Sequence, residues 1–155
     1  PMLRFEGDRD FALKPAELWA TLTDARFLVQ CIPDVESIAE VGPDHAVLVL
    51  RPGFAFVRGA LDVTLRVVDK SEASAARVLL HSKGIGSSSD VEAGLALAAH
   101  EDGTRVHWSA EVKSLGGLLK MVPVGLVRGA AQKVVGDAWA ARVQLRLHGG
   151  PGAVA

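Results

Sequence analysis

The stretch TRVHWSAEVK, residues 104–113, decides the class of fold because apolar and polar side chains alternate along it. Val106, Trp108, Ala110 and Val112 fall on one face of an extended chain, and the charged and hydroxyl side chains fall on the other. An antiparallel sheet with one face against a core and the other in water gives this pattern. The stretch therefore predicts a β-strand whose apolar face needs a cover.

The same period of two extends back through the middle of the chain. It is found in VESIAEV (35–41), HAVLVLRPGFAFVRG (45–59), ALDVTLRVVD (60–69), ARVLLHSKG (76–84) and SDVEAGLALAAHEDG (89–103). Turn signals such as GPD and EDG close two of these segments. Consecutive strands joined by short turns predict an antiparallel meander.

Two short helices are predicted near the start of the chain. Residues 3–14 alternate as a strand, and residues 15–24 then begin with proline, which suits a first helical turn. Leu18, Trp19 and Leu22 follow at helical spacing and are expected to pack inward. A second helix is expected over ARFLVQC (25–31), because the proline that follows disfavours further helix.

After SLGG (114–117) the apolar period becomes helical. One stripe of a long C-terminal helix contains Val127, Ala131, Val134, Ala138, Ala141 and Leu145. The predicted fold is α+β: a curved antiparallel sheet of about seven strands wrapped around this helix, with two short helices after the first strand. Residues 1–148 are expected to form one domain, and the glycine-rich residues 149–155 a flexible tail. GGLLKMVPVGLV (116–127) is expected to be the packed start of the helix, with a lid as the alternative.

Composition excludes several classes of function. The 155 residues are 49% hydrophobic and 23% charged with a net charge of −1, as in a soluble domain without general attraction to nucleic acid. No apolar run reaches the roughly 18 residues of a membrane span, and no signal segment is recognised, so we expect a cytoplasmic protein. Histidine and the single cysteine show no metal-ligand spacing, so neither a metal nor a cofactor is expected.

Cys31 is the one candidate nucleophile of the thiol type. Its neighbours Phe27, Leu28, Val29 and Ile32 are apolar, which would raise the pKa of the thiol, and no histidine is expected beside it. We therefore expect Cys31 to be a small buried apolar residue and the protein not to be an enzyme.

Four segments carry a resemblance to a known family. They are FEGDRDFALKPAELWATLTD (5–24), CIPDVESIAEVG (31–42), VRGALDVTLRVVD (57–69) and LGGLLKMVPVGLVRGAAQKV (115–134). With them the chain resembles the START-like (helix-grip, SRPBCC) superfamily, and within it the G-subunit family of carbon monoxide dehydrogenase, from about residue 3 to 146. It departs from the family pattern at Asp34, where glycine is usual, at Pro123, and in lacking a long C-terminal tail, which puts tail-mediated docking in doubt.

The resemblance implies a hydrophobic cavity between the sheet and the C-terminal helix, used by relatives for lipids, sterols, polyketides or quinone-like molecules. Apolar surface and position in the pattern select the expected lining: Leu28, Cys31, Ile32, Phe54, Phe56, Leu65, Trp108, Met121, Leu126, Val134 and Ala138. The expected function is that of a carrier or accessory protein that binds a lipid or quinone-like molecule.

Two other functions remain open. An enzyme of the polyketide cyclase or aromatase type would need polar groups converging on the cavity, for which only Gln30, Ser82 and Ser109 are candidates. An assembly factor for a molybdenum-containing hydroxylase would act through its surface, and such a hydroxylase is the partner that the family suggests. The assembly role is compatible with carrying a ligand. A lid formed by residues 116–127 would allow peripheral membrane contact, and an exposed sheet edge would allow a homodimer.

Overall fold

One antiparallel sheet dominates the structure. The computed structural model describes residues 3–53, 58–143 and 146–147, without the side chains of residues 140–142. Within these ranges seven strands pair in the order β1-β7-β6-β5-β4-β3-β2. They are β1 (Arg4–Phe11), β2 (Val35–Val41), β3 (His45–Leu50), β4 (Leu61–Ser71), β5 (Ala75–Gly84), β6 (Ser87–His100) and β7 (Gly103–Gly117). The first strand closes the far edge beside the last, so β1 and β2 are the two edge strands.

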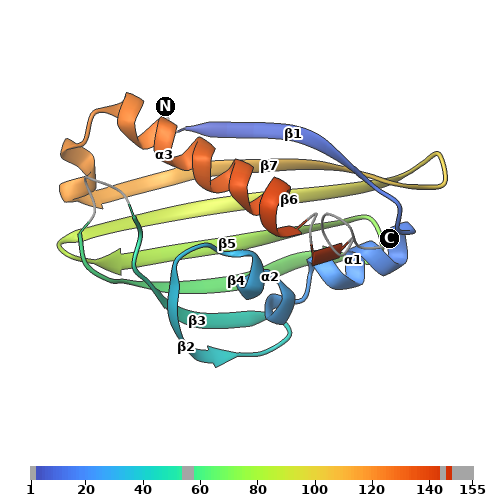
Figure 1. The fold of residues 1–155 in the computed structure, drawn as a ribbon, viewed down its shortest axis with the longest axis horizontal. Coiled ribbons are helices and arrows are strands. Elements are labelled where there is room, and N and C mark those ends of the chain that lie inside the picture. The colour runs from blue at the N-terminus through green and yellow to red at the C-terminus, as the bar shows by residue number, and fades with distance from the viewer. Residues whose placement is uncertain (1–2, 54–57, 144–145, 148–155) are drawn as a thin grey trace.

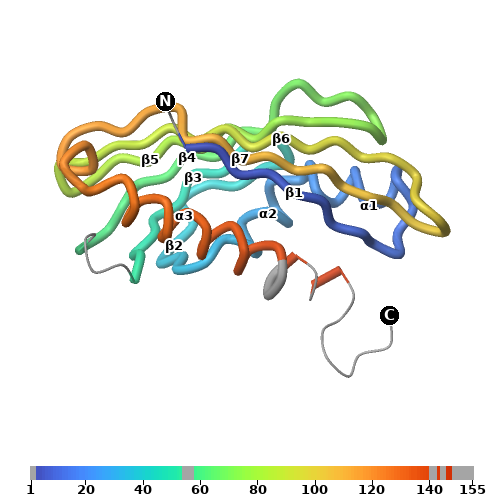
Figure 2. Tube along the Cα trace, turned by 90° about the horizontal axis from the view of Figure 1, so that it is seen from above, coloured from blue at the N-terminus to red at the C-terminus, as the bar shows by residue number. Residues whose placement is uncertain are grey.

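The helices lie on one side of this sheet (Figure 1). Helices α1 (Pro15–Leu22) and α2 (Ala25–Cys31) connect β1 to β2, and α3 (Val124–Asp137) runs diagonally across the same face. Figure 2, turned by 90°, shows the sheet as one layer and α3 with α2 as the other. The predicted α+β helix-grip architecture is therefore confirmed. We call the side that faces the helices the inner face and the opposite side the outer face.

The predicted alternation along the strands is also confirmed. On β7, Val106 and Val112 are buried while His107 and Lys113 are exposed. On β4, the side chains of Val63, Leu65 and Val67 are buried, and the polar residues between them point outward. Strand pairing then places apolar residues opposite one another, as in Leu65 with Leu80, so the inner face is apolar across the sheet.

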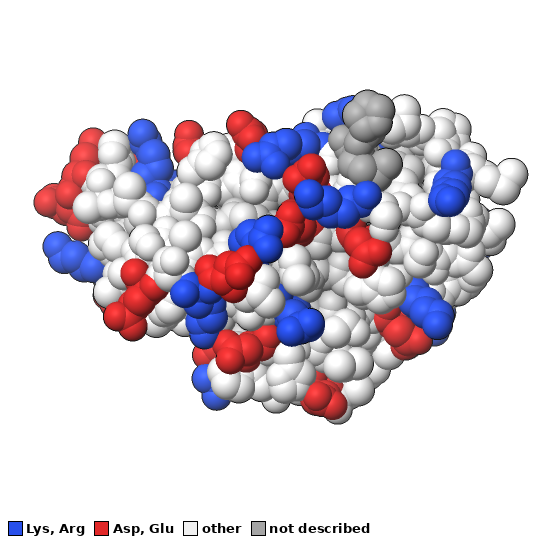
Figure 3. Space-filling view, turned by 180° about the vertical axis from the view of Figure 1, so that it is seen from behind, with Lys and Arg blue, Asp and Glu red and all other residues white. Residues whose placement is uncertain are grey.

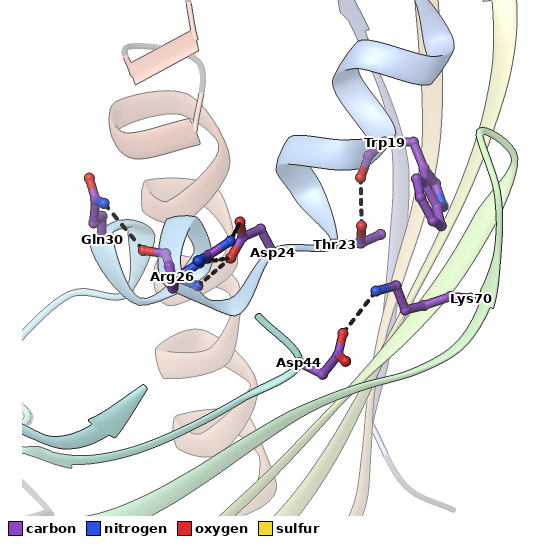
Figure 4. Close-up of polar contacts among 7 residues, drawn as sticks. All are labelled: Trp19, Thr23, Asp24, Arg26, Gln30, Asp44 and Lys70. Carbon is purple, nitrogen blue, oxygen red and sulfur yellow. Dashed lines mark hydrogen bonds and ion pairs between the residues drawn. The ribbon is translucent and has the colours of Figure 1, made fainter. Parts of the chain in front are cut away.

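Figure 4 shows polar contacts within α1 and α2 and, beside them, the pair between Asp44 and Lys70. Pro15 starts α1, and the side chain of Asp24 caps α2 by accepting a hydrogen bond of 2.9 Å from the backbone N–H of Arg26. The indole Nε1 of Trp19 donates to the carbonyl oxygen of Ala75 at 2.8 Å. Lys70 pairs with Asp44 at 2.8 Å, with its Nζ 5.8 Å from the centroid of the Trp19 ring.

The cap at Asp24 gives a prediction for acid conditions. The hydrogen bond from the Arg26 side chain lowers the pKa of the Asp24 carboxyl from its ordinary value of 3.8. A carboxyl whose pKa is lowered by folding stabilises the fold fully above its unfolded-state pKa, and this contribution is lost as the pH falls through the folded-state pKa. Asp24→Asn keeps a capping side chain but removes the titrating group, so its free energy of unfolding should fall less than that of the wild type between about pH 5 and pH 2.

Urea denaturation at several pH values measures this difference. Asp102→Asn, at an exposed carboxylate in the β6–β7 turn, serves as the control. An acid dependence of Asp24→Asn equal to that of the wild type would contradict the assignment.

The segment between β7 and α3 differs from the prediction. Residues 116–127 do not form a packed helix start: β7 ends at Gly117, a 3₁₀ turn η1 follows (Leu118–Met121), and α3 begins only after Pro123. Gly117 has φ of 61°, and a Cβ there would clash with the carbonyl oxygen of Gly86, so this turn requires glycine. Large apolar side chains of this segment are exposed, namely Leu118, Met121, Val124 and Leu126.

The far end of the C-terminal helix changes its hydrogen-bonding pattern. The α-helix ends at Asp137 and continues as a π-helical segment, η2 (Ala138–Val143). Of the predicted apolar stripe, Val127 is buried, and Ala131, Val134 and Ala138 are half-buried. Leu145 and the side chain of Ala141 lie outside the described part of the chain.

Asp34 is the residue that departs from the glycine of the family pattern. It adopts φ of 63°, in the left-handed region that glycine enters without steric cost. Its carbonyl oxygen accepts a hydrogen bond of 2.9 Å from the backbone N–H of Arg51. Aspartate, with its short polar side chain, tolerates this conformation better than most residues. The turn between α2 and β2 can therefore form with aspartate in place of glycine.

Candidate functional site

The buried apolar residues form three separate clusters rather than one core. The first joins α2 to β3, β4 and β5, the second joins α1, β6 and β7 to Val143, and the third joins Val127 to Leu3 and Val112. Helix α3 thus touches the sheet near its start, through Val127, and η2 touches it through Val143. The inner face between these contacts is less tightly covered.

Partly exposed apolar side chains mark this less covered region. Those on the strands point toward the helices, and those on α2 and its C-cap pack against the cluster on the sheet, yet each keeps part of its surface accessible to solvent. We call them the inner apolar surface; they are Leu28, Ile32, Leu50, Leu61, Leu80, Val91, Ala93 and Ala110.

Strand register makes the inner apolar surface continuous. Leu50 lies opposite Leu61, and Leu80 lies opposite Val91. Ala93 is placed between Val78 on β5 and Ala110 on β7, so two alanines stand side by side near the middle of the sheet. The side chains there are small, and Val134 of α3 and Ala138 of η2 are half-buried.

The residues predicted to bind a ligand divide into four groups. Leu28, Ile32, Trp108, Val134 and Ala138 are half-buried between the two layers or at the edge of this space. Leu65 and Cys31 are 2% and 4% exposed, so both are core residues behind the surface. Met121 and Leu126 are 81% and 55% exposed, so neither lines the inner wall as expected; the 3₁₀ turn and Pro123 turn this segment outward. Phe54 and Phe56 lie outside the described residues.

Most of the inner apolar surface was missed from the sequence. Leu50, Leu61, Leu80, Val91, Ala93 and Ala110 all have the inward position in the alternation, but so do fully buried residues such as Val63. The period of two predicts whether a side chain lies on the inner or the outer face of the sheet. How much of that side chain is exposed depends on where the helices lie. Trp139, which packs against Trp108, was also missed.

Cys31 takes the structural role that its surroundings predict. It ends α2 and is buried in the cluster of Phe11, Leu18 and Leu22. The four histidines that the structure describes are on the outer face or in its turns: His45, His81, His100 and His107. No described histidine therefore activates this thiol.

Cys31→Ser should lower the free energy of unfolding by about 1 to 3 kcal/mol, because it places a hydroxyl in an apolar site. It should leave the affinity for any lipophilic ligand within about twofold, since Cys31 lies behind the surface rather than on it. Urea denaturation and ligand titration measure the two quantities. A variant of normal stability that no longer binds ligand would contradict this interpretation.

The outer face carries a network of ion pairs that crosses five strands, from β1 through β7, β6 and β5 to β4 (Figure 3). It runs through Arg4, Glu111, Lys113, Glu92, Arg77 and Asp69. The hydrogen bond with Glu111 raises the pKa of Lys113, and the hydrogen bond from Arg105 lowers the pKa of Asp10. Both pKa shifts occur at exposed ion pairs. Structural networks of charges commonly shift pKa values in this way, so the shifts do not mark a catalytic site.

One polar group on the outer face combines serine, aspartate and histidine. Asp90 accepts a hydrogen bond of 2.7 Å from Ser114 Oγ and pairs with His81 Nδ1 at 2.7 Å, and the contact with Ser114 is the main cause of its lowered pKa. The carboxylate stands between the hydroxyl and the imidazole, so the histidine cannot take the serine proton directly. This order is the wrong one for a nucleophilic triad.

A shallow hollow of about 220 Å³ lies on the same face around Gly94, between Arg77 and His107. It is open to solvent. Its charged side chains are already paired, Arg77 with Asp69 and His107 with Asp8. Among the described residues no group of three or more His, Cys, Asp or Glu side chains is arranged to hold a metal ion.

Polar groups on the inner face are few. Ser82 and Ser89 share a hydrogen bond of 2.5 Å between their hydroxyls. Of the other candidates, Ser109 points to the outer face, and Gln30 is exposed and donates to the carbonyl oxygen of Arg26. The strands that the structure describes place no aspartate, glutamate or histidine on the inner face.

Comparison with known proteins agrees with this geometry. The G-subunit family of carbon monoxide dehydrogenase (CoxG) matches the chain over residues 7–142. No curated protein sequence matches significantly. No helix in the described part of the chain is long and apolar enough to cross a membrane.

Solved structures share the fold at low sequence identity. A conserved protein from Geobacillus kaustophilus has a TM-score of 0.81 at 22% identity, covering 95% of this chain and 96% of that one. A START superfamily protein from Mycobacterium smegmatis has a TM-score of 0.66 at 11% identity, covering 96% and 99%. The protein Ara h 8.0201 has a TM-score of 0.61 at 15% identity, covering 94% and 99%.

Proposed function

The chain belongs to the carbon monoxide dehydrogenase CoxG family, and from this premise we propose that it binds a small lipophilic molecule between the sheet and α3. In this proposal the protein is a carrier or accessory protein and not an enzyme. The lipophilic molecule is a lipid or a quinone-like compound.

The inner apolar surface is the observation that carries the proposal. Its side chains face the helices and remain partly accessible, so a ligand inserted there would remove apolar area from water on both layers. Burial of apolar area contributes about 25 cal/mol per Å², against which the cost of association must be set. The exposed side chains of Leu118, Met121, Val124 and Leu126 favour the lid alternative for this segment, at the end of the sheet where a ligand would enter.

The polar content of the inner face argues against the enzyme alternative. A cyclase or aromatase needs ionisable groups that exchange protons with its substrate. The described inner face offers the Ser82–Ser89 pair, the Trp108 indole and Arg9, and the carboxylates and imidazoles belong to the outer face. Such a surface suits binding better than acid–base chemistry.

The partner that we propose is a molybdenum-containing hydroxylase of the carbon monoxide dehydrogenase type. The support for it is family membership alone. Affinity capture with the full chain in cells that express such a hydroxylase tests it, and recovery of the hydroxylase at background level would count against this partner.

Extraction of the purified protein with organic solvent, followed by mass spectrometry, tests ligand binding. We expect a lipophilic compound in a molar amount close to that of the protein. A quinone or fatty acid added at a hundredfold excess over Kd should stabilise the protein by about 2.7 kcal/mol and raise Tm by about 5 to 10 °C. If nothing is extracted and neither compound changes Tm, the proposal is wrong.

A further inference from the structure

The indole N–H of Trp108 has no hydrogen-bond partner. Its Nε1 atom is buried, and it makes no hydrogen bond in the described part of the chain. Trp19 shows the ordinary arrangement, since its Nε1 donates to the carbonyl oxygen of Ala75 at 2.8 Å. A buried donor without an acceptor is rare in folded proteins because it loses its hydrogen bond to water without replacement.

Packing holds the ring of Trp108 in this position. On one side lies Gly7 of β1, where a Cβ would come within 3.0 Å of Trp108 Cζ2 and 3.2 Å of Nε1. On another lies Trp139, with ring centroids 6.1 Å apart and ring planes inclined by 31°. Trp139 is in turn 6.2 Å from the ring of Phe11. The orphan donor thus belongs to a fixed aromatic group beside the inner apolar surface.

The register connects this group to the rest of the inner face. Trp108 lies opposite Gly7 on one side and Leu95 on the other, and Ala110 of the inner apolar surface is the next inward residue on the same strand. A ligand that covers Ala93 and Ala110 therefore ends beside the indole of Trp108.

We propose that the Trp108 indole N–H donates a hydrogen bond to a carbonyl oxygen on a planar ring of the ligand. The inference rests on the proposed lipophilic ligand and narrows it to the quinone-like class. A flat ring fits beside two tryptophan rings, which prefer offset or tilted aromatic contacts at such distances. The hydrogen bond would satisfy the one buried side-chain donor among the described residues that has no hydrogen-bond partner.

A neutral acceptor suits this position better than a carboxylate. The residues around Trp108 are apolar, including Phe11, Leu95 and Leu97. A charged head group would lose its hydration there, and Arg9, the inward cation on the neighbouring strand, already has an interaction within the chain. A carbonyl oxygen needs only the one donor.

Trp139 is the ring that the C-terminal helical region contributes to this aromatic group. It occupies the second position of the π-helical segment η2, where the helix changes its hydrogen-bonding pattern. Such segments are frequent at functional sites.

The test compares two probes of equal shape on the full chain. 2,3-Dimethyl-1,4-naphthoquinone carries two carbonyl oxygens and no free quinone ring position for a thiol to attack, and 2,3-dimethylnaphthalene carries no acceptor. We expect the wild type to bind the quinone at least about tenfold more tightly in equilibrium dialysis. Trp108→Phe should weaken quinone binding about tenfold and change hydrocarbon binding less than about twofold.

Two further variants and a fatty acid complete the test. Trp19→Phe removes an indole N–H that already has a protein acceptor, and it should leave both affinities unchanged. If Trp108→Phe does not fold, benzothienylalanine at position 108 keeps the ring shape and replaces the N–H by sulfur. Oleate serves as the carboxylate probe.

The outcomes separate the inference from the proposed function. If Trp108→Phe weakens the binding of both naphthalene probes equally, or weakens only the binding of oleate, the carbonyl assignment is wrong. The proposal of a lipophilic ligand would still stand. Failure of the wild type to bind any of the three probes overturns the proposed function together with the inference.

Discussion

Ala93→Trp is expected to weaken binding of the lipophilic ligand by about a hundredfold. Ala93 lies near the middle of the inner apolar surface, between Val78 and Ala110, and is only half-buried. An indole at this position would occupy the space that the ligand uses, and overlap of this kind costs up to about 3 kcal/mol, or roughly a hundredfold in Kd. The indole would also cover apolar side chains that are partly exposed, so the free energy of unfolding should be kept or raised.

Ala98→Trp provides the matched control for this experiment. Ala98 lies on the same strand but is exposed on the outer face, opposite Arg105. The Ala98→Trp variant should bind 2,3-dimethyl-1,4-naphthoquinone with the affinity of the wild type in equilibrium dialysis. Unchanged binding by a folded Ala93→Trp variant would show that the ligand lies elsewhere.

Leu22→Ala is expected to have the largest effect on stability, about 3 kcal/mol. Leu22 is 1% exposed and packs in the cluster that holds α1 against β6 and β7. Truncation of a buried leucine removes apolar contacts and leaves a cavity, which together cost about 2 to 5 kcal/mol. For a chain of this size Tm should fall by about 6 to 12 °C.

Leu126→Ala makes the same chemical change at an exposed site, since Leu126 is 55% exposed. Its free energy of unfolding should stay within about 0.5 kcal/mol of the wild type. Urea denaturation followed by circular dichroism measures both variants, and an unchanged slope with urea confirms that the same transition is observed. A cost below about 1 kcal/mol for Leu22→Ala would contradict the assignment of this cluster as core.

The fold was predictable from the sequence because its signals are local. The alternation around Val106 sets the inward face of a strand, and Pro15 and Pro33 bound the two short helices. These features depend on residues within a few positions of one another. The strand order follows once short turns connect consecutive strands, since only the β1–β7 pair joins distant segments.

The site was less predictable because it depends on contacts between distant segments. Val63 and Leu80 have the same inward position on their strands, yet α2 covers the first, and the second remains partly exposed. Met121 has an apolar side chain suited to a cavity, but a 3₁₀ turn directs it to solvent. The missing partner of Trp108 depends on three elements at once, β1, β7 and η2, so no pattern within one segment could indicate it.

Gly7 has a consequence for the position of the Trp108 indole N–H. It lies on an edge strand and has no side chain of its own, yet its empty Cβ position sets the depth at which the ring of Trp108 rests. One added methyl group there would come within 3.0 Å of Trp108 Cζ2, so the indole and its N–H would have to shift. A single substitution on an edge strand would therefore change the hydrogen bond that we propose for the ligand, although position 7 itself contributes no polar group to it.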